Sequence, residues 1–406
     1  MAELLVRAST MDAALLRRIY GFGEGCGSAL VRPARIVVDA HVPVSSRGGD
    51  VIAVARRAGV PFLIDPQTFY LQGAQHPDDP WAALPFGQPA KFSANNLDVF
   101  AQEELVAQTV EYQISHGATA IIPPYVHLDR LDDGWIDVQA GLWHRTRRYL
   151  DRENIALPTT AVLALGWRAL HPVHGPAALA PVLAALSALA PSEVALAASK
   201  VDQGVRTHDR VMDLILMIER IRREHHVIAW QQGHLGETCV AAGAVGYECG
   251  IGWRESCDLG TAANAHRNPP SAGARSARPV YIPQLGRSIP KRSVEAIREC
   301  RDLWMRTICL DTECCPPGGA ALLGDARAHA IVQRVKNLDE IARIDRPVWR
   351  WQRLAGVADN GLDLANRINR RAEAAPAISQ VNTRALAAIS AVSHTRRVDV
   401  RSRRVA

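Results

Sequence analysis

Short apolar runs alternate with longer helix-like segments along most of this chain, and this alternation limits the possible folds more than any other feature. The runs are apolar on both faces, as is typical of strands in a parallel sheet that helices cover. They are RIVVDAHV (35–42), PFLID (61–65), ATAIIPPYVHL (118–128), TTAVLALGW (159–167), EVALAASKVD (193–202), HVIAWQQ (226–232), AVGYECGIG (244–252) and PVYIPQLG (279–286). Eight strands in about 250 residues favour a (β/α)8 barrel, with an open doubly wound sheet as the alternative.

The segments between these runs have helical periodicity. They span 48–59, 98–116, 136–154, 176–190, 206–224, 236–243 and 291–306. In the clearest of them, Val211, Leu214 and Ile218 share one face while charged residues occupy the other. The short segment 236–243 fits the repeat least well.

The fold class that follows is α/β, a (β/α)8 TIM-type barrel with an appended C-terminal helical subdomain that contains cysteines. We predict an N-terminal lead-in at 1–33, the barrel at 34–306, the subdomain at 307–392 and a basic tail at 393–406.

Composition predicts a soluble cytoplasmic protein without a membrane partner, and it is compatible with a homo-oligomer. Of 406 residues, 48% are hydrophobic and 22% are charged. The N-terminus has scattered charges instead of a signal sequence, and no apolar run reaches the roughly 20 residues that span a bilayer. Eight cysteines without an export signal predict reduced thiols.

The C-terminal residues 381–406 contain six arginines and one aspartate, within a chain of net charge +6. Such a tail can bind nucleic acid through its phosphates. The alternative is a solvated, frayed terminus.

Polar side chains follow nearly every predicted strand, and in a barrel the carboxyl ends of the strands form the active site. The candidate catalytic residues are Asp65, Asp202, Lys200 and Glu248. The candidate substrate-binding residues are Asp39, His41, Gln67, Tyr125, His127, Trp167, Gln232, His234, Arg254 and Gln284.

Two of these candidates have a specific chemical reason. Asp65 ends a strand because Pro66 cannot donate to a sheet, so its carboxylate points where the strand ends point, unless it only caps the loop. Lys200 is one of four lysines among 47 basic residues, and a desolvated lysine attacks carbonyl groups. A plain ion pair between Lys200 and Asp202 is the alternative.

Cys309, Cys314 and Cys315, followed by His329 in a helical segment, offer three thiols and one imidazole. Structural zinc takes four such ligands. We therefore predict a structural zinc site, with buried free thiols as the alternative.

The order of these parts resembles the tRNA-guanine transglycosylase family and its DNA-modifying relatives. Asp65-Pro-Gln-Thr-Phe69 is similar to the family motif D-S-G-G-F-Q without its glycines, and Gly233-His-Leu-Gly236-Glu237 is similar to G-G-L-A-V-G-E. The resemblance implies a (β/α)8 barrel with a Cys3His zinc subdomain. It also implies exchange of guanine for a 7-deazaguanine through an aspartate nucleophile, for which no residue here has the family's sequence context.

Three functions follow as hypotheses. The first is an enzyme, a transglycosylase-like glycosyltransferase that modifies a nucleobase in RNA or DNA, with Asp65 as general acid/base and Asp202 or Glu248 as nucleophile. The second is a small-molecule lyase or aldolase in which Lys200 forms a Schiff base. The third is a barrel that binds a partner without catalysis.

Overall fold

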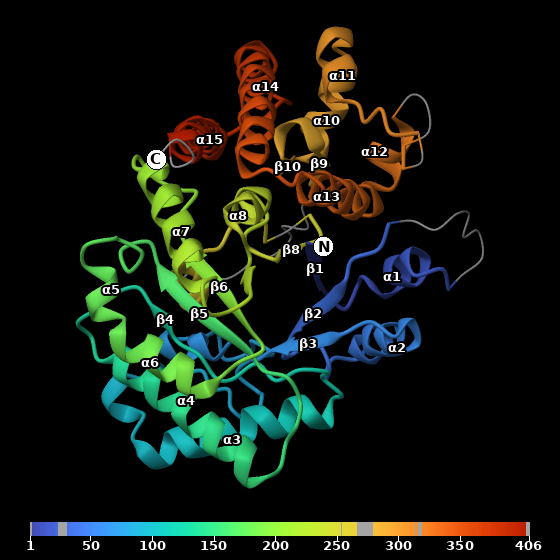
Figure 1. The fold of residues 1–406 in the computed structure, drawn as a ribbon. Helices are drawn as coiled ribbons and strands as arrows, with labels where there is room; N and C mark the ends of the chain where they lie inside the picture. Colours follow the sequence, from blue (N-terminus) through green and yellow to red (C-terminus); the bar gives the residue numbers. More distant parts are fainter. Residues whose placement is uncertain are drawn as a thin grey trace.

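The computed structural model describes residues 2–22, 31–252, 254–265, 279–312, 314–315 and 319–402. Eight parallel strands form one curled sheet in the order β3-β2-β1-β8-β7-β6-β5-β4 (Figure 1). Their bounds are β1 Glu3–Ala8, β2 Arg35–Asp39, β3 Phe62–Asp65, β4 His127–Leu128, β5 Thr160–Gly166, β6 Glu193–Ser199, β7 Val227–Ala229 and β8 Gly246–Gly250. The predicted class, an α/β TIM-type barrel, is confirmed.

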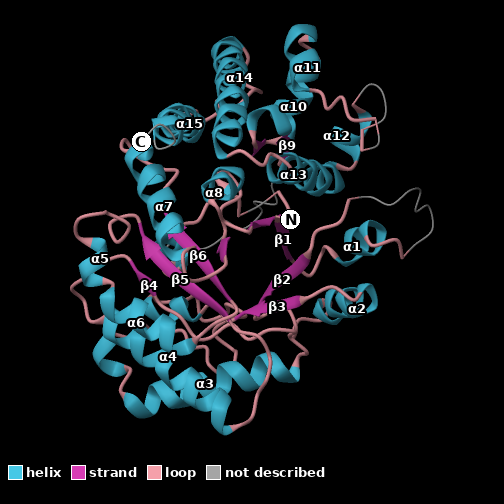
Figure 2. Ribbon diagram, in the orientation of Figure 1, coloured by secondary structure: helices cyan, strands magenta, loops and turns pink. Residues whose placement is uncertain are grey.

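Helices follow the strands and lie around the outside of the sheet (Figure 2). They are α1 Ala13–Ile19, α2 Gly48–Ala58, α3 Val99–Ser115, α4 Trp135–Arg152, α5 Gly175–Ala178, α6 Ala180–Leu189, α7 Thr207–Ile221 and α8 Gly236–Ala242. The short helix α8, the least certain part of the predicted repeat, is present. One apolar cluster fills the space between sheet and helices, and a second lies inside the barrel.

The strand that begins the barrel differs from the prediction. β1 lies within residues 1–33, which were expected to precede the barrel, and it pairs with both β2 and β8. The run at 279–286 is instead β9 Val280–Ile282, which forms an antiparallel hairpin with β10 Arg287–Ile289 outside the barrel. The run Glu3–Ala8 escaped detection because Glu3 and Arg7 interrupt its apolar character.

The two edges of the sheet, β3 and β4, approach each other without a full ladder. The predicted strand 118–128 is reduced to β4 and a single bridge at Ile121, because Pro123 and Pro124 cannot donate backbone hydrogen bonds. Thr119 N donates to Phe62 O at 2.8 Å and links the two edges. The barrel is therefore open along most of this seam.

The C-terminal third of the chain supplies the last helix around the barrel and adds a further layer of helices. After β8 come α9 Leu259–Ala262, the hairpin, α10 Lys291–Arg298, α11 Arg301–Thr307, α12 Ala320–Gly324, α13 Ala326–Ala342, α14 Pro347–Ala374 and α15 Arg384–Ser402. Short 3-10 turns span Thr68–Gln72, Ala94–Asn96 and Pro283–Leu285. α13 packs on β1, α1 and α8, so it occupies the place of the last ring helix. The hairpin, α10 to α12 and the cysteines are thus inserted between β8 and α13 (Figure 1).

Candidate active site and metal centre

The side chains that point into the barrel follow from the alternation along each strand. On β1, Leu5 belongs to the interior cluster, whereas Leu4 and Val6 belong to the cluster under the helices. The residue two positions further along a strand points to the same side. The inward positions near the carboxyl ends of the strands hold polar and aromatic side chains: Arg7, Asp39, Asp65, Tyr125, His127, Trp230 and Glu248.

Arg7 lies at the centre of this end of the barrel and is 5% exposed. Its Nη1 donates to Asp39 at 2.6 Å, and its Nη2 donates to Asp65 at 2.8 Å. Nε and Nη2 also donate to the two oxygens of Glu248, at 3.0 and 3.2 Å. These contacts use four of the five guanidinium N–H groups and join carboxylates from three strands.

Asp65 is fully buried and accepts hydrogen bonds from several elements. Tyr125 Oη donates to one oxygen at 2.8 Å, and Trp230 Nε1 donates to the other at 3.3 Å. The backbone N–H of Gln67 adds a third donor at 3.0 Å, besides Arg7. The end of β3 at Asp65 thus builds a fixed support for Arg7. The Asp65 carboxylate has no surface exposed to solvent.

Asp39 is the carboxylate that borders open space. Its second oxygen pairs with Arg254 Nη1 at 2.5 Å. Arg7, Asp39, His41 and Arg254 line a cavity of about 250 Å³ at the carboxyl ends of β1, β2 and β8. A ligand in this cavity would contact Asp39 and both arginines.

The carboxylates of this group differ in proton affinity. Burial alone would raise the pKa of Asp39, but Arg254 and Arg7 more than reverse this effect and hold it well below its usual range. Burial raises the pKa of Glu248, and Arg7 offsets this only in part because Asp65 lies nearby. One carboxylate is therefore held ionised while the pKa of another is raised, and such a difference in proton affinity suits acid–base chemistry.

A second polar group lies beside Gly260. Lys200 Nζ pairs with Asp258 Oδ1 at 3.4 Å instead of with Asp202, which was the expected partner. Burial lowers the pKa of His127 to about 4, and its buried Nε2 has no hydrogen-bond partner among the described residues. The side chain of Lys200 is 43% exposed and next to a carboxylate, whereas Schiff-base lysines are desolvated.

A third group joins the barrel to the insertion. Asp202 accepts from His234 Nδ1 at 2.8 Å and from Ser256 Oγ at 2.6 Å. His234 Nε2 lies 3.4 Å from Glu255, which also pairs with the buried Arg334 of α13. Burial alone would lower the pKa of His234, but hydrogen bonds to Asp202 and Glu255 raise it above its usual value.

This third group predicts a pH dependence of stability. Folding raises the pKa of His234. The contribution of His234 to the free energy of unfolding is therefore complete below its unfolded pKa of about 6.5, and it is lost as pH rises through the folded pKa. The lowered pKa of Asp202 and Glu255 affects stability only in acid. We expect the melting temperature of the wild type to fall as pH rises above about 6.5, and that of His234→Gln to fall less.

His208→Gln is the control for this measurement, because His208 is exposed. It should keep the wild-type slope of melting temperature against pH. Equal slopes in the wild type and His234→Gln would contradict the prediction. Arg287, which opposes protonation of His234, is unchanged in both variants.

The remaining predicted residues divide between the mouth of the barrel and other places. Gln67 and Gln232 are buried at the mouth, and Gln232 Nε2 donates to Ala198 O at 2.8 Å. Trp167 follows β5, and the guanidinium carbon of Arg210 lies 3.9 Å from the centre of the Trp167 ring. Gln284 lies in the insertion, where its side chain donates to Ile308 O at 3.0 Å. The structure therefore does not bring Gln284 to the site.

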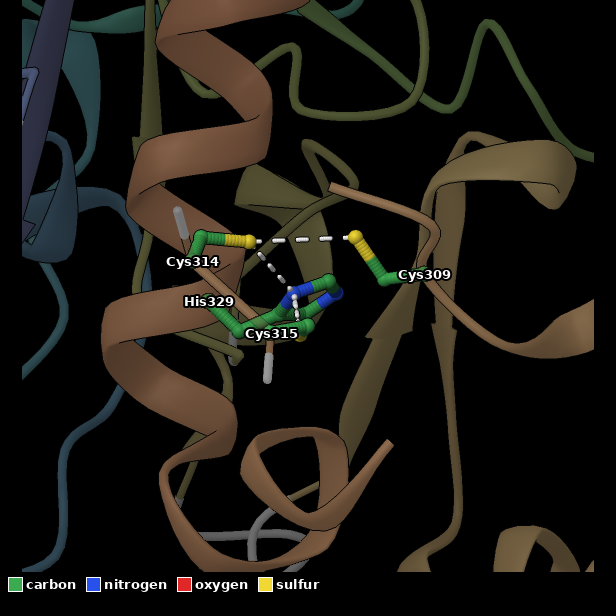
Figure 3. Close-up of side chains that lie close together, drawn as sticks. All are labelled: Cys309, Cys314, Cys315 and His329. Atoms are coloured by element: carbon green, nitrogen blue, oxygen red, sulfur yellow. Dashed lines mark hydrogen bonds between the residues drawn. The ribbon is translucent and has the colours of Figure 1, made fainter. Parts of the chain in front are cut away.

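Cys309, Cys314, Cys315 and His329 point toward one another, as Figure 3 shows, and their possible ligand atoms all lie within 4.8 Å of one another. The Sγ atoms of Cys309 and Cys314 are 3.7 Å apart, and His329 Nδ1 is 3.5 Å from Cys314 and 3.2 Å from Cys315. A tetrahedral zinc ion requires roughly 3.8 Å between two sulfurs and roughly 3.6 Å between sulfur and nitrogen. The four residues therefore fit a zinc ion.

The surroundings orient these ligands. His329 Nε2 lies 3.0 Å from Tyr281 O, so a proton there leaves the Nδ1 lone pair facing the sulfurs. Gln333 Nε2 donates to Cys314 Sγ at 3.1 Å and to Asp311 at 2.9 Å. These contacts are typical of the second coordination sphere of a structural metal site. A bound metal would tie the inserted segment to α13.

Arg7 and Arg334 were not among the predicted site residues. Arg7 lay in the presumed lead-in, although a polar residue just after the apolar run Leu4–Val6 was a usable signal. Arg334 lies on the buried face of α13, donates to Gly233 O at 2.8 Å and stacks on Tyr281. Neither arginine stands out in a chain that is rich in arginine.

The C-terminal residues expected to form a basic tail are largely helical. α15 packs against α14 and α7. Arg396 is 5% exposed, pairs with Glu219 and lies over the Trp351 ring, whereas Arg384 is exposed. Residues 403–406 and the side chain of Arg401 lie outside the described part. No helix among the described residues is long and apolar enough to cross a bilayer.

Comparisons with known proteins show similarity of fold alone. No family model matches the chain, and no curated protein matches it. A GH18 chitinase from Pseudoalteromonas aurantia is 8% identical, with 61% of this chain and 93% of that chain covered at a TM-score of 0.39. Orotidine 5'-monophosphate decarboxylase from Sulfolobus solfataricus is 12% identical, with 65% and 94% covered at 0.32. The carboxyl transferase domain of Rhizobium etli pyruvate carboxylase is 11% identical, with 98% and 78% covered at 0.34.

Proposed function

We propose that this protein is an enzyme of the transglycosylase type, which exchanges or modifies a nucleobase in RNA or DNA at the mouth of the barrel. The observation that carries the proposal is the group around Arg7, in which carboxylates from β2, β3 and β8 meet on one buried guanidinium. Glycosyl transfer needs two carboxyl groups in different protonation states beside the glycosidic carbon. The Cys3His group, in a late insertion into the barrel, agrees with the same family resemblance.

The roles follow from exposure and proton affinity. Asp39 borders the cavity and is held ionised by Arg7 and Arg254, so it is placed to attack or stabilise the sugar carbon. Burial raises the pKa of Glu248, so Glu248 is the candidate proton donor. The carbon–nitrogen bond to the leaving base breaks as a carboxylate–carbon bond forms, and the base takes the proton. The incoming base then attacks the same carbon, the carboxylate leaves, and the N–H proton that the incoming base loses passes to Glu248.

Asp65 and Asp202 take supporting roles in this scheme. Asp65 holds Arg7, Tyr125 and Trp230 in place instead of facing a ligand. Asp202 holds His234. The polynucleotide would approach this end of the barrel, where the exposed Lys200 offers a positive charge, and Arg384 of α15 is a candidate phosphate contact.

Base exchange can be measured directly. Transfer RNA and duplex DNA are each incubated with the protein and radiolabelled guanine, and label in the polymer is counted. We expect incorporation into one of the two polymers. Asp39→Asn and Glu248→Gln should each reduce it by about 10²–10⁴-fold, because each removes a proton-transfer or charge-stabilising group while preserving shape.

Asp132→Asn is the matched control, because Asp132 is exposed and contacts only Arg130 in the described structure. It should exchange base at the wild-type rate. Absence of label in both polymers, or full activity of both site variants, would refute the proposed function. The aldolase alternative predicts instead that Lys200→Arg abolishes activity, and the exposure of Lys200 does not favour it.

A further inference from the structure

The segment 257–263, just after β8, lies inside the mouth of the barrel. Cys257, Leu259 and Ala263 are 2%, 1% and 4% exposed. They belong to the interior apolar cluster together with side chains from the strand ends: Phe69, Tyr125, Ile228 and Trp230. At the carboxyl end of the barrel, a loop segment therefore occupies interior space. At the opposite end, side chains of the strands occupy this space.

The strands opposite the Arg7 group leave room for this segment. The inward positions near the carboxyl ends of β5 and β6 include Ala164 and Ala197, which also belong to the interior cluster. Small side chains on one half of the barrel and large charged ones on the other half make an asymmetric chamber. Leu259 occupies this chamber in the closed structure.

Few polar contacts hold the segment in place. Lys200 N donates to Cys257 O at 2.8 Å, and Leu259 N donates to Ser199 Oγ at 3.1 Å. Gln75 Nε2 donates to Ala263 O at 2.9 Å. The ion pair between Lys200 and Asp258 is half exposed, and α9 has only four residues. Such a segment is a unit that can open without unfolding the barrel.

Groups that the reaction needs are also buried at this end of the barrel. Glu248 and Trp230 have no exposed surface, although both are polar groups at the mouth of an enzyme-like barrel. Cys257 shares the interior cluster with Trp230, which donates to Asp65 of the Arg7 group. A ring that is to meet Glu248 must therefore take the place of the segment.

We propose that residues 257–263 form a displaceable plug, which closes the barrel mouth in the free protein and moves out to admit a planar ring to the chamber above Glu248. The admission of a nucleobase rests on the proposed function, whereas the opening of the plug does not. The Lys200–Asp258 pair is its outer latch, and Leu259 is its apolar anchor. An incoming phosphate can compete with Asp258 for Lys200 and so favour the open state.

Cysteine labelling tests the opening without any substrate. The folded protein is exposed to N-ethylmaleimide, and the labelling rate of each cysteine is followed by mass spectrometry of its peptide. Cys239 and Cys249 are buried in the barrel wall and report global unfolding. We expect Cys257 to be labelled faster than both, and Leu259→Ala to accelerate Cys257 about thirtyfold or more while Cys239 and Cys249 remain slower than Cys257.

Two further variants complete the test. Leu285→Ala removes an equally buried leucine from the insertion and should leave the Cys257 rate unchanged. Lys200→Met removes the latch and should accelerate Cys257 by about two- to fivefold, with Cys239 and Cys249 still slower than Cys257. Cys257 rates equal to those of Cys239 and Cys249 in the wild type and in Lys200→Met would overturn the plug. If the three cysteines are labelled at the same rate in Leu259→Ala, that variant has lost its fold, and the Lys200→Met result decides.

The two proposals fail separately. Labelling of Cys257 needs no nucleic acid, so a plug that opens in a protein without exchange activity would refute only the proposed function. Exchange activity in a protein whose Cys257 is never labelled locally would refute only the plug.

Discussion

Replacing Arg7 with methionine is expected to lower the free energy of unfolding by about 3–5 kcal/mol. The substitution keeps a long side chain but leaves Asp39, Asp65 and Glu248 facing one another in a buried site without their shared cation. The cost comes from uncompensated buried charge, not from lost volume. Urea unfolding at neutral pH, followed by circular dichroism, measures it.

The same experiment has two controls. Arg130→Met removes an arginine that pairs only with Asp132 in the described structure, and it should not measurably change stability. Adding Asp65→Asn and Glu248→Gln to Arg7→Met should restore part of the loss, because two of the three carboxylates are then neutral. If Arg7→Met alone is as stable as the wild type, Arg7 does not stabilise the mouth of the barrel.

Metal analysis of the purified protein is expected to give about one zinc per chain, and Cys314→Ser should lose it. Zinc at a Cys3His site contributes on the order of 10 kcal/mol of apparent free energy at neutral pH. The variant, or the wild type treated with a chelator, should therefore unfold the inserted segment well before the barrel.

Cys300→Ser is the matched variant for this measurement, since Cys300 lies in the insertion but outside the Cys3His group. It should retain its zinc and the wild-type melting curve. A wild-type protein without metal, or a Cys314→Ser variant that keeps it, would leave these residues as buried thiols.

The sequence predicted the periodic parts of the fold well and its irregular parts poorly. Runs such as 159–167 and 193–202 became full strands because Ala, Val and Leu suit both faces of a covered parallel sheet. The run at 279–286 also contains β-forming apolar residues, yet it became part of a hairpin because its partner, 287–289, lies only a few residues away. Local composition does not reveal which strand will be the partner.

The candidate site was predictable where side chains follow strands directly. Asp39, Asp65 and Glu248 were placed from their positions alone, and they do meet. What could not be predicted is the charge that brings them together, because Arg7 lies on a strand that was not recognised. The prediction that Lys200 pairs with Asp202 was also wrong. Asp258 reaches Lys200 from a loop, and no strand register fixes the path of a loop.

The central position of β1 has a consequence for synthesis of the chain on the ribosome. Arg7 and Glu248 are 241 residues apart in sequence. At roughly 5–20 residues per second, the first strand is made roughly 12–50 s before its last carboxylate partner. Throughout that interval the nascent N-terminal half carries an arginine, two aspartates and an unpaired strand edge. A chaperone that shields such an edge would therefore act on the first half of this chain, and fragments ending before β8 should aggregate instead of folding.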